Sequence, residues 1–282
     1  MKFKTFYKLF YAHRVKKAKN LLKIYLVVIL PFKYLYNLPF VPPKINLDKL
    51  EKKKSDLFNK DLNYLFDYFN TDKGNFYENQ YAQPSKRKRE KIKAHGYGKF
   101  YESYFKKFKD KELNILEIGS FFGNASASFF FYFKNSFLYA ADIYTDLFRY
   151  HSKRMQNFYV NSSEEKSIQE NIINKKIEFD IIIEDAGHSL KDQIISLFLL
   201  FKKLKSGGLF IVEELDFPDT RKDMNLNNEK PTLREILNQI KNNISFDSKY
   251  VSLENKKYFL DNFSSIEIFI GNFNEIAIIK KK

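Results

Sequence analysis

Short apolar runs bounded by polar residues recur along the chain from residue 114 onward. Those with the length of buried strands cover residues 114–118, 137–142, 157–163, 179–183 and 209–212. Segments whose apolar residues recur at helical spacing separate these runs, and the clearest of them covers residues 190–204. Strands that alternate with helices in this way are typical of right-handed βαβ units packed into one parallel sheet.

The last part of the chain adds further elements to this order. A helix is expected at residues 231–242, with Pro231 near its start, where proline is well tolerated. Two more strand-like runs, residues 264–270 and 275–279, follow and are joined by a short turn. The polar segment 216–230 interrupts the pattern, and we expect it to be either a lid over a ligand or a solvated loop.

The first strand-like run ends in a glycine-containing turn, N-I-L-E-I-G-S-F-F-G at residues 114–123. Gly119 and Gly123 allow a buried strand to turn sharply into a helix beneath a nucleotide-like ligand. A dinucleotide site needs Gly-x-Gly-x-x-Gly so that backbone amides approach a pyrophosphate, and this run has a different spacing. The carboxylate of Glu117 beside the turn favours a cationic ligand without phosphate, of which S-adenosylmethionine is the common one. The alternative is an ordinary strand-to-helix turn of an α/β protein.

Polar residues also follow the next two strand-like runs. Asp142 ends the run 137–142, and from the end of a neighbouring strand its carboxylate can accept hydrogen bonds from both ribose hydroxyls. Asn161 and Ser162 or Ser163 end the following run, and we expect them to contact an adenine ring. Together with the glycine turn, these residues predict one nucleoside site at the carboxyl edge of the sheet.

Acidic residues and one histidine follow the last two runs of the parallel series. Asp185 and His188 come after one of these runs, and Glu213 and Glu214 come directly after the other. Because consecutive parallel strands end at the same edge, these side chains should gather beside the glycine turn. Carboxylates so close together repel each other unless a positive group lies among them, and oxygen ligands select a hard divalent cation such as Mg²⁺. The alternative is that each carboxylate caps a helix or faces solvent.

Four parts of the sequence resemble those of a known family. They are T-D-K-G with H-G-Y-G-K-F-Y downstream, L-E-I-G-S-F-F-G, F-D-I-I-I-E-D-A-G-H and G-G-L-F-I-V-E-E-L. In these parts, residues 71–282 resemble the class I S-adenosylmethionine-dependent methyltransferases, and among them the metal-dependent O-methyltransferases that act on macrolide sugars. The resemblance implies a doubly wound, mostly parallel, seven-stranded, Rossmann-like α/β sheet that closes with an antiparallel C-terminal hairpin.

The resemblance also implies roles for the acidic residues. In that family, the aspartate and histidine spaced like Asp185 and His188 are a metal ligand and the catalytic base, and the acidic pair aligned with Glu213 and Glu214 supplies further ligands. The family usually has Asp-Asp-Gly-Ser-His where this chain has E-D-A-G-H, and Glu-Asp where it has E-E. The activity implied is S-adenosylmethionine-dependent, Mg²⁺-assisted methyl transfer to a sugar hydroxyl of a glycan or glycosylated metabolite.

Composition limits the partners of such an enzyme. The 282 residues carry a net charge of +15 and no cysteine, which excludes disulfides and thiolate metal sites. Such a charge ordinarily suggests nucleic acid, but lysine, asparagine and isoleucine are all frequent, as in proteins of AT-rich genomes, and no RNA-recognition motif is present. We therefore expect a small-molecule or glycan acceptor and a cytoplasmic protein. Two alternatives stay open: methyl transfer to RNA or protein, and a non-catalytic, membrane-associated binding module on the same fold.

The first 44 residues differ from the rest, because they contain ten Lys or Arg and no Asp or Glu. Apolar residues recur there at helical spacing with lysines on the other side, and basic amphipathic helices often lie on anionic membranes. The apolar run 21–30 is interrupted by Lys23 and is too short to span a bilayer, and prolines from Pro31 onward indicate an irregular linker. We expect residues 1–30 to contact the inner face of a membrane, to pack on their own domain, or to form a homo-oligomer contact.

These patterns together predict two parts of unequal size. Residues 1–60 form a basic amphipathic extension and its linker. Residues 61–282 form the methyltransferase domain, with a helical lead-in at 61–110 and the Rossmann-like core at 111–282.

Overall fold

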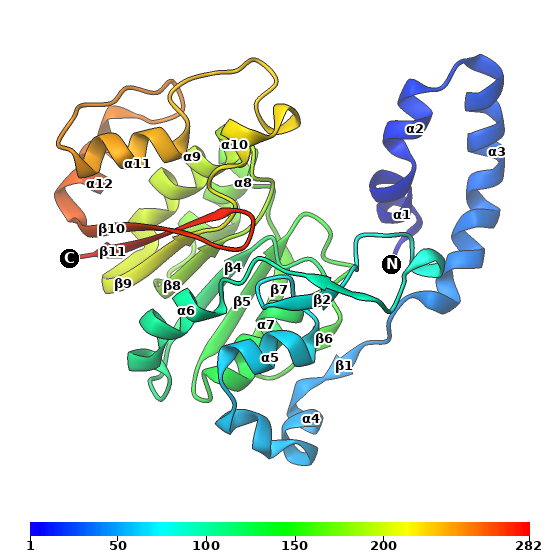
Figure 1. The fold of residues 1–282 in the computed structure, drawn as a ribbon, viewed down its shortest axis with the longest axis horizontal. Coiled ribbons are helices and arrows are strands. Elements are labelled where there is room, and N and C mark those ends of the chain that lie inside the picture. The colour runs from blue at the N-terminus through cyan, green and yellow to red at the C-terminus, as the bar shows by residue number, and fades with distance from the viewer.

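A seven-stranded sheet lies at the centre of the computed structural model, which describes residues 1–282 (Figure 1). Its strands are β4 (Asn114–Ile118), β5 (Phe137–Asp142), β7 (Met155–Tyr159), β8 (Phe179–Glu184), β9 (Leu204–Val212), β10 (Phe263–Ile270) and β11 (Glu275–Lys281). Their order across the sheet is β10-β11-β9-β8-β4-β5-β7. The strands from β9 to β7 in this order are parallel, whereas β11 is antiparallel to both β9 and β10. The predicted mostly parallel α/β sheet with a C-terminal antiparallel hairpin is confirmed.

The order of the strands reverses at β4. This strand pairs with β5, the next strand along the chain, on one side and with β8 on the other. Its last residue, Ile118, lies opposite Ala141 in β5 and Glu184 in β8, so the three strands end at the same level. A crevice at the carboxyl ends of strands beside such a reversal is where open α/β sheets bind ligands.

Helices cover both faces of the sheet (Figure 1). One face packs against α5 (Leu62–Phe69), α6 (Gly98–Phe105) and α7 (Asn124–Tyr132), and the other against α8 (Glu165–Ile168), α9 (Leu190–Leu200), α11 (Leu233–Lys241) and α12 (Leu253–Asn262). Side chains alternate between the two cores along each strand. In β4, for example, Ile115 belongs to the first core, and Leu116 and Ile118 belong to the second.

Several predicted boundaries shift in the structure. Strand β9 already begins at Leu204, so the predicted turn at Ser206–Gly208 is a bulge within the strand, where Gly207 has φ of +73°. The helix α9 accordingly ends earlier than expected, at Leu200. Strand β7 ends at Tyr159, earlier than the predicted residue 163, so the polar residues after it lie in a loop. The polar segment 216–230 contains the short helix α10 (Phe217–Thr220).

The N-terminal residues form a helical hairpin that stands beside the sheet (Figure 1). Its helices are α1 (Phe3–Phe10), α2 (Ala12–Lys17) and α3 (Asn20–Asn37). Pro31 lies inside α3, so the predicted irregular linker begins after Asn37 and not at Pro31. The continuous segment Asn20–Phe40 has 21 residues and a mean hydropathy of 1.5, which makes it long and apolar enough to cross a membrane by length and composition alone. The expectation that the apolar segment is too short is corrected accordingly.

The remaining elements of the chain are short. They are β1 (Ile45–Asn46), α4 (Leu47–Lys53), β2 (Phe76–Glu78), β3 (Lys91–Lys93) and β6 (Tyr150–His151), together with single turns of other helix types at Leu38–Phe40, Ser55–Asn59, Pro84–Lys86, Lys106–Phe108, Gln169–Ile173, Phe201–Lys203 and Lys222–Met224. Leu47 and Leu57 are buried in the first core. The division at residue 60 stays a prediction, and the packed core includes residues on both sides of it.

Candidate functional site

A pocket of about 650 Å³ lies at the carboxyl edge of the sheet. Most of the residues predicted from the sequence line it, namely Gly119, Asp142, Asn161, Ser162, Asp185, His188 and Glu214. The other three predicted residues, Glu117, Gly123 and Glu213, lie outside its lining. We call the part around Gly119, Asp142, Asn161 and Ser162 the nucleoside end, and the part around Asp185, His188 and Glu214 the carboxylate end.

The two glycine positions of the turn after β4 have no space for a side chain. Gly119 has φ of +91°, and a Cβ atom there would lie 1.8 Å from the backbone carbonyl oxygen of Asp185. Gly123 has φ of +80°, and a Cβ atom there would lie 2.5 Å from the ring of Phe148. Both positions therefore require glycine, for backbone conformation and for space. Through Gly119, the nucleoside end touches the backbone of the carboxylate end.

Asp142 organises the loops at the nucleoside end. The backbone N–H of Phe121 donates to its Oδ2 at 2.8 Å, and that of Tyr144 donates to its Oδ1 at 2.6 Å. Burial raises the pKa of the Asp142 carboxyl, and the two backbone donors oppose that shift. Asn161 and Ser162 line the same end of the pocket from the loop after β7.

Glu117 is buried and does not line the pocket. Its side chain accepts a hydrogen bond from the Ser126 hydroxyl and lies 4.0 Å from the ammonium of Lys73. Burial raises the pKa of its carboxyl, against the opposing charge of Lys73. Its predicted contact with a cofactor stays a prediction.

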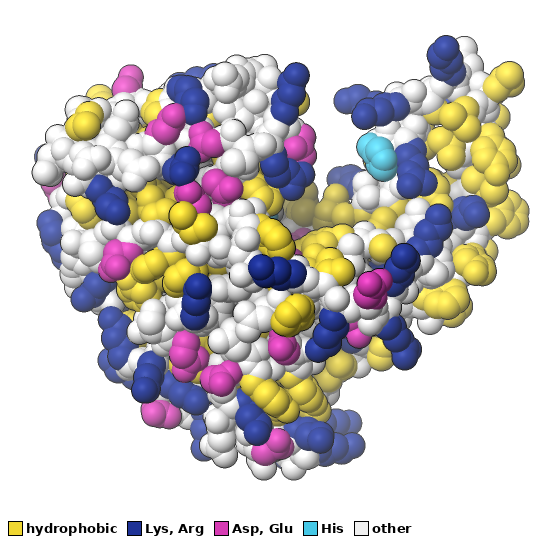
Figure 2. Space-filling model, viewed as in Figure 1, with side chains coloured by type: hydrophobic (Ala, Val, Ile, Leu, Met, Phe, Trp, Pro, Cys, Tyr) yellow, Lys and Arg dark blue, Asp and Glu magenta, His cyan; other side chains and the backbone are white.

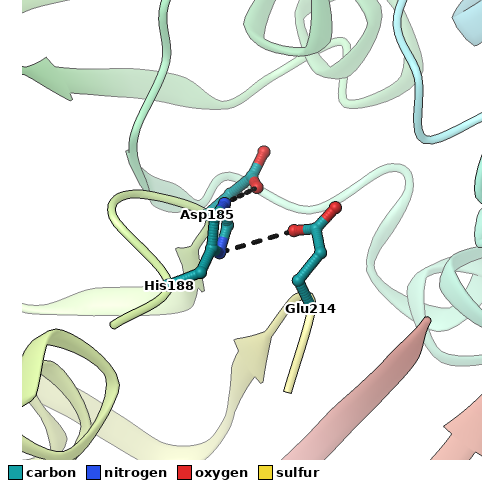
Figure 3. A group of neighbouring side chains, drawn as sticks. All are labelled: Asp185, His188 and Glu214. Atoms are coloured by element: carbon teal, nitrogen blue, oxygen red, sulfur yellow. Dashed lines mark ion pairs between the residues drawn. The ribbon is translucent and has the colours of Figure 1, made fainter. Parts of the chain in front are cut away.

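The carboxylate end brings together three side chains from two strand ends (Figure 3). One potential ligand atom each of Asp185, His188 and Glu214 lies within 4.8 Å of the others. The His188 ring lies between the two carboxylates, with Nε2 3.6 Å from Oδ1 of Asp185 and Nδ1 3.5 Å from Oε2 of Glu214. His188 Nδ1 and Glu214 Oε2 are buried and have no hydrogen-bond partner. Two carboxylate groups, one of them with an unpartnered oxygen, fit a divalent cation.

The backbone of the site is held in rarely populated conformations. His188 has φ of 53°, and both Glu214 and Phe121 have φ of 45°. Each left-handed residue other than glycine costs on the order of 1–3 kcal/mol and persists only where the surroundings enforce it. Such residues cluster at functional sites, and here they lie at both ends of one pocket.

Lys73 is a buried cation whose partners the sequence did not predict, although the T-D-K-G run made it a weak candidate for contact with a substrate or cofactor. Its ammonium contacts Asp185 Oδ2 and lies 2.7 Å from Oε1 of Glu213, which also accepts a hydrogen bond from the Tyr101 hydroxyl. Burial lowers the pKa of Lys73, but its carboxylate neighbours outweigh that effect and raise the pKa above its ordinary value. Glu213 is therefore paired with Lys73 and Tyr101 and is not part of the group of Asp185, His188 and Glu214. The sequence signal for Lys73 was the T-D-K-G run.

His95, from the run H-G-Y-G, holds the other oxygen of Glu214. Its Nε2 lies 3.0 Å from Oε1 of Glu214, and its Nδ1 lies 3.1 Å from the side-chain amide of Asn274. Burial lowers the pKa of His95, but the hydrogen bond and the charge of Glu214 together raise it to about 9. Burial lowers the pKa of His188, and the charge of Glu214 opposes that effect without cancelling it.

No protein-family model matches the chain, but a curated protein and several solved structures are similar to it. The 8-demethyl-8-alpha-L-rhamnosyl tetracenomycin-C 2'-O-methyltransferase of Streptomyces olivaceus is 27% identical over 128 residues, which are 43% of this chain and 33% of that relative. The solved structure of the MycE methyltransferase from the mycinamycin biosynthetic pathway, in complex with Mg and SAH, superposes with a TM-score of 0.60. The two share 17% identity, over 79% of this chain and 55% of that one.

A second solved structure of the MycE methyltransferase, in complex with Mg, SAH and mycinamycin VI, gives a TM-score of 0.59 at 17% identity over 79% of this chain and 53% of that one. The chain has the class I methyltransferase fold. The resemblance that the sequence motifs predicted is confirmed. The chain spans 33% of the length of its curated relative and about half of each solved structure, 53% and 55%.

Proposed function

We propose that the chain is an S-adenosylmethionine-dependent, divalent-metal-assisted O-methyltransferase that acts on a sugar hydroxyl. One observation carries the proposal: a single pocket contains both a nucleoside end and a carboxylate end, joined where Gly119 abuts Asp185. Methyl transfer requires a donor and an acceptor oxygen held close together and aligned, which one continuous pocket provides.

The nucleoside end has groups suited to the cofactor. Asp142 offers carboxylate oxygens to the ribose hydroxyls, and Asn161 and Ser162 offer polar atoms beside the adenine. Gly119 lets the turn after β4 pack directly against the backbone of Asp185, which joins this end to the carboxylate end. The cofactor, when bound, supplies a methyl group already activated on a sulfonium centre.

Asp185 and Glu214 are the residues we assign to the cation. A bound Mg²⁺ supplies Lewis acidity, which lowers the pKa of a hydroxyl. Lys73 occupies one oxygen of Asp185 and leaves the other facing His188, and His95 occupies one oxygen of Glu214 in the same way. The remaining oxygens therefore point into the space around His188. Glu213, which we also predicted as a ligand, supports the site through Lys73 in this proposal.

His188 is the residue we assign as general base. Burial lowers the pKa of its imidazole, which favours the neutral form, and its two ring nitrogens face the carboxylates of Asp185 and Glu214. In this state it can accept the proton of the acceptor hydroxyl, a contribution of about 10²–10⁴-fold to the rate. The edge of its ring packs against Phe217, 5.3 Å away between ring centres.

A sugar is the acceptor class that the relatives favour. The curated relative is named for methylation at a 2' oxygen of a rhamnosyl compound, and one solved structure contains mycinamycin VI. The lining of the pocket also contains Phe217, Arg221 and Met224 from the segment after β9, and we assign this part to the acceptor. A vicinal diol suits this site, since two adjacent hydroxyls can chelate one cation.

A methyl-transfer assay tests the proposal. The purified chain is incubated with labelled S-adenosylmethionine and a panel of nucleotide sugars and envelope glycans, with Mg²⁺ or with a chelator. We expect label in at least one glycan with Mg²⁺, and its loss with the chelator. Activity that survives the chelator, or that appears only on RNA or protein, would overturn the assignment.

A further inference from the structure

The outer side of helix α3 is an exposed apolar surface. Its most exposed apolar side chains are Leu21 (85%), Phe32 (68%), Val28 (63%) and Tyr36 (63%). Figure 2 shows apolar side chains gathered along the outer edge of the hairpin. Only 11% of the apolar segment is buried. Contiguous apolar surface of this kind on a soluble protein marks an interaction site.

The inner side of α3 is already occupied within the hairpin. Leu26, Leu30 and Tyr34 recur at helical spacing and pack with the buried Phe6 of α1 and its neighbours. The rings of Phe6 and Tyr34 lie 5.6 Å apart. The exposed surface is therefore what remains after the hairpin has formed its own small core, so it requires a partner outside the hairpin.

The charge of the hairpin indicates the chemistry of that partner. Residues 1–44 contain ten Lys or Arg and no acidic residue. Lys16 and Lys17 end α2 and Lys19 directly precedes α3, so all three lie near the end of α3 that carries Leu21. An apolar surface flanked by basic side chains suits an anionic lipid bilayer, where the apolar groups enter the acyl boundary and the basic groups meet the headgroups.

The geometry favours a helix in the plane of the membrane over one that crosses it. Lys23 and Lys33 lie ten residues apart in α3, which is about 15 Å along a helix. This is about half of the thickness of the hydrocarbon core of a bilayer. The helices α1 and α2 also pack beside α3, and they carry Lys4, Lys8 and Arg14, which a membrane interior would not accept.

We propose that the outer face of α3 docks on an anionic lipid bilayer and that the hairpin thereby holds the pocket at the membrane surface. Leu9 of α1 lines the pocket. The start of α1 is hydrogen-bonded to the loop after β5. Asp146 in that loop accepts hydrogen bonds from the Thr5 hydroxyl at 2.6 Å and from the Lys2 backbone N–H at 2.5 Å. Figure 2 shows a hollow between the hairpin and the rest of the molecule. The docking itself does not depend on the proposed function.

Sedimentation of the full chain with lipid vesicles tests the docking. The vesicles contain either phosphatidylcholine alone or equal parts of phosphatidylcholine and phosphatidylglycerol. We expect binding to the mixed vesicles, at least about tenfold weaker binding to phosphatidylcholine alone, and weakening by added salt. The variant Val28→Glu/Phe32→Glu should lose at least about tenfold in affinity. The matched control Leu253→Glu/Ile270→Glu, at exposed apolar positions outside the hairpin, should bind like the unaltered chain.

A second variant and a second measurement complete the test. Lys16→Gln/Lys17→Gln/Lys19→Gln leaves the apolar surface intact and should also weaken binding to the mixed vesicles, so it decides the outcome if the glutamate variant loses its helix by circular dichroism. Equal binding of all variants, or of both vesicle types, would overturn the proposal. So would a lipid-free dimer, by light scattering, that the glutamate variant alone converts to a monomer, because a second copy would then cover the surface.

Discussion

The two ends of the pocket are built by different means. The nucleoside end is shaped mainly by backbone: Gly119 supplies a turn without a side chain, and Asp142 binds two backbone N–H groups. The carboxylate end is shaped by charged side chains from distant segments, with Lys73, Asp185 and Glu214 in one cluster. A short run of sequence suffices for the first arrangement, whereas the second exists only once the whole domain has folded.

This difference also determines how strongly a single substitution affects each end of the pocket. Charges in a buried cluster depend on one another, so the removal of one partner leaves the others without compensation. Hydrogen bonds from a backbone turn are local, and each contributes modestly to stability. We therefore expect large effects from single substitutions at the carboxylate end and smaller ones at the nucleoside end.

The largest effect is expected for His188→Ala. Loss of the general base should reduce methyl transfer by about 10²–10⁴-fold, while the affinity for S-adenosylmethionine stays nearly unchanged. Steady-state kinetics and calorimetry measure the two quantities. His151→Ala, at an exposed histidine outside the pocket, is the matched control and should keep full activity. Lost cofactor binding with unchanged turnover per bound cofactor would contradict the role of His188.

Lys73→Met should strongly destabilise the fold. The substitution leaves Asp185 and Glu213 without their buried cation, and breaking a buried ion pair costs about 3–5 kcal/mol. Urea denaturation measures the loss. Lys166→Met, which removes an exposed ammonium 3.8 Å from Glu170, should leave the unfolding midpoint almost unchanged. Equal effects of the two substitutions would show that the cluster does not depend on Lys73.

Gly119→Ala should disturb both ends of the pocket together. A Cβ atom there would lie 1.8 Å from the carbonyl oxygen of Asp185, so backbone must move, at a cost of about 1–3 kcal/mol. We expect weaker binding of both cofactor and cation. Gly207→Ala is a matched control, since Gly207 has φ of +73° but nothing within 4 Å of the added atom. A variant that weakens cofactor binding alone would indicate that the two ends are independent.

Asp142→Asn should have the smallest effect. The amide keeps the shape of the side chain but loses the charge that strengthens hydrogen bonds to ribose hydroxyls, and its NH2 group cannot accept from one of the two backbone N–H groups, so the Kd for S-adenosylmethionine should rise about tenfold. Calorimetry measures the change, with the exposed Asp247→Asn as control. An unchanged Kd would remove Asp142 from the cofactor site.

The parts of the fold that depend on local pattern could be predicted from the sequence. The parallel strands, the glycine turn and the C-terminal hairpin follow from apolar runs and from residues next to each other in the chain. The start of β9 was missed because Gly207 and Gly208 read as a turn, whereas the structure accommodates them as a bulge. The extent of α3 was missed because Pro31 reads as a helix end, although it lies within the helix.

The candidate site was predicted less completely, because part of it depends on contacts between segments that are far apart in the sequence. Asp185 and His188 follow one strand, so their proximity could be inferred from the topology of a parallel sheet. The contact of Lys73 with Asp185 could not be inferred in this way, because the segment of Lys73 lies far from both residues in the sequence and reaches them only through tertiary packing. The different partners of Glu213 and Glu214, adjacent in the chain, likewise depend on which side chains other segments bring to each.

Binding of Mn²⁺ to the intact chain, followed by electron paramagnetic resonance, tests whether the carboxylate end is a cation site. We expect the unaltered chain to bind one Mn²⁺, and Asp185→Asn and Glu214→Gln each to weaken that binding at least about tenfold, because each removes a charged ligand. Asp247→Asn should bind Mn²⁺ like the unaltered chain. No binding by the unaltered chain, or equal binding by all of these variants, would contradict the assignment of Asp185 and Glu214 to a divalent cation.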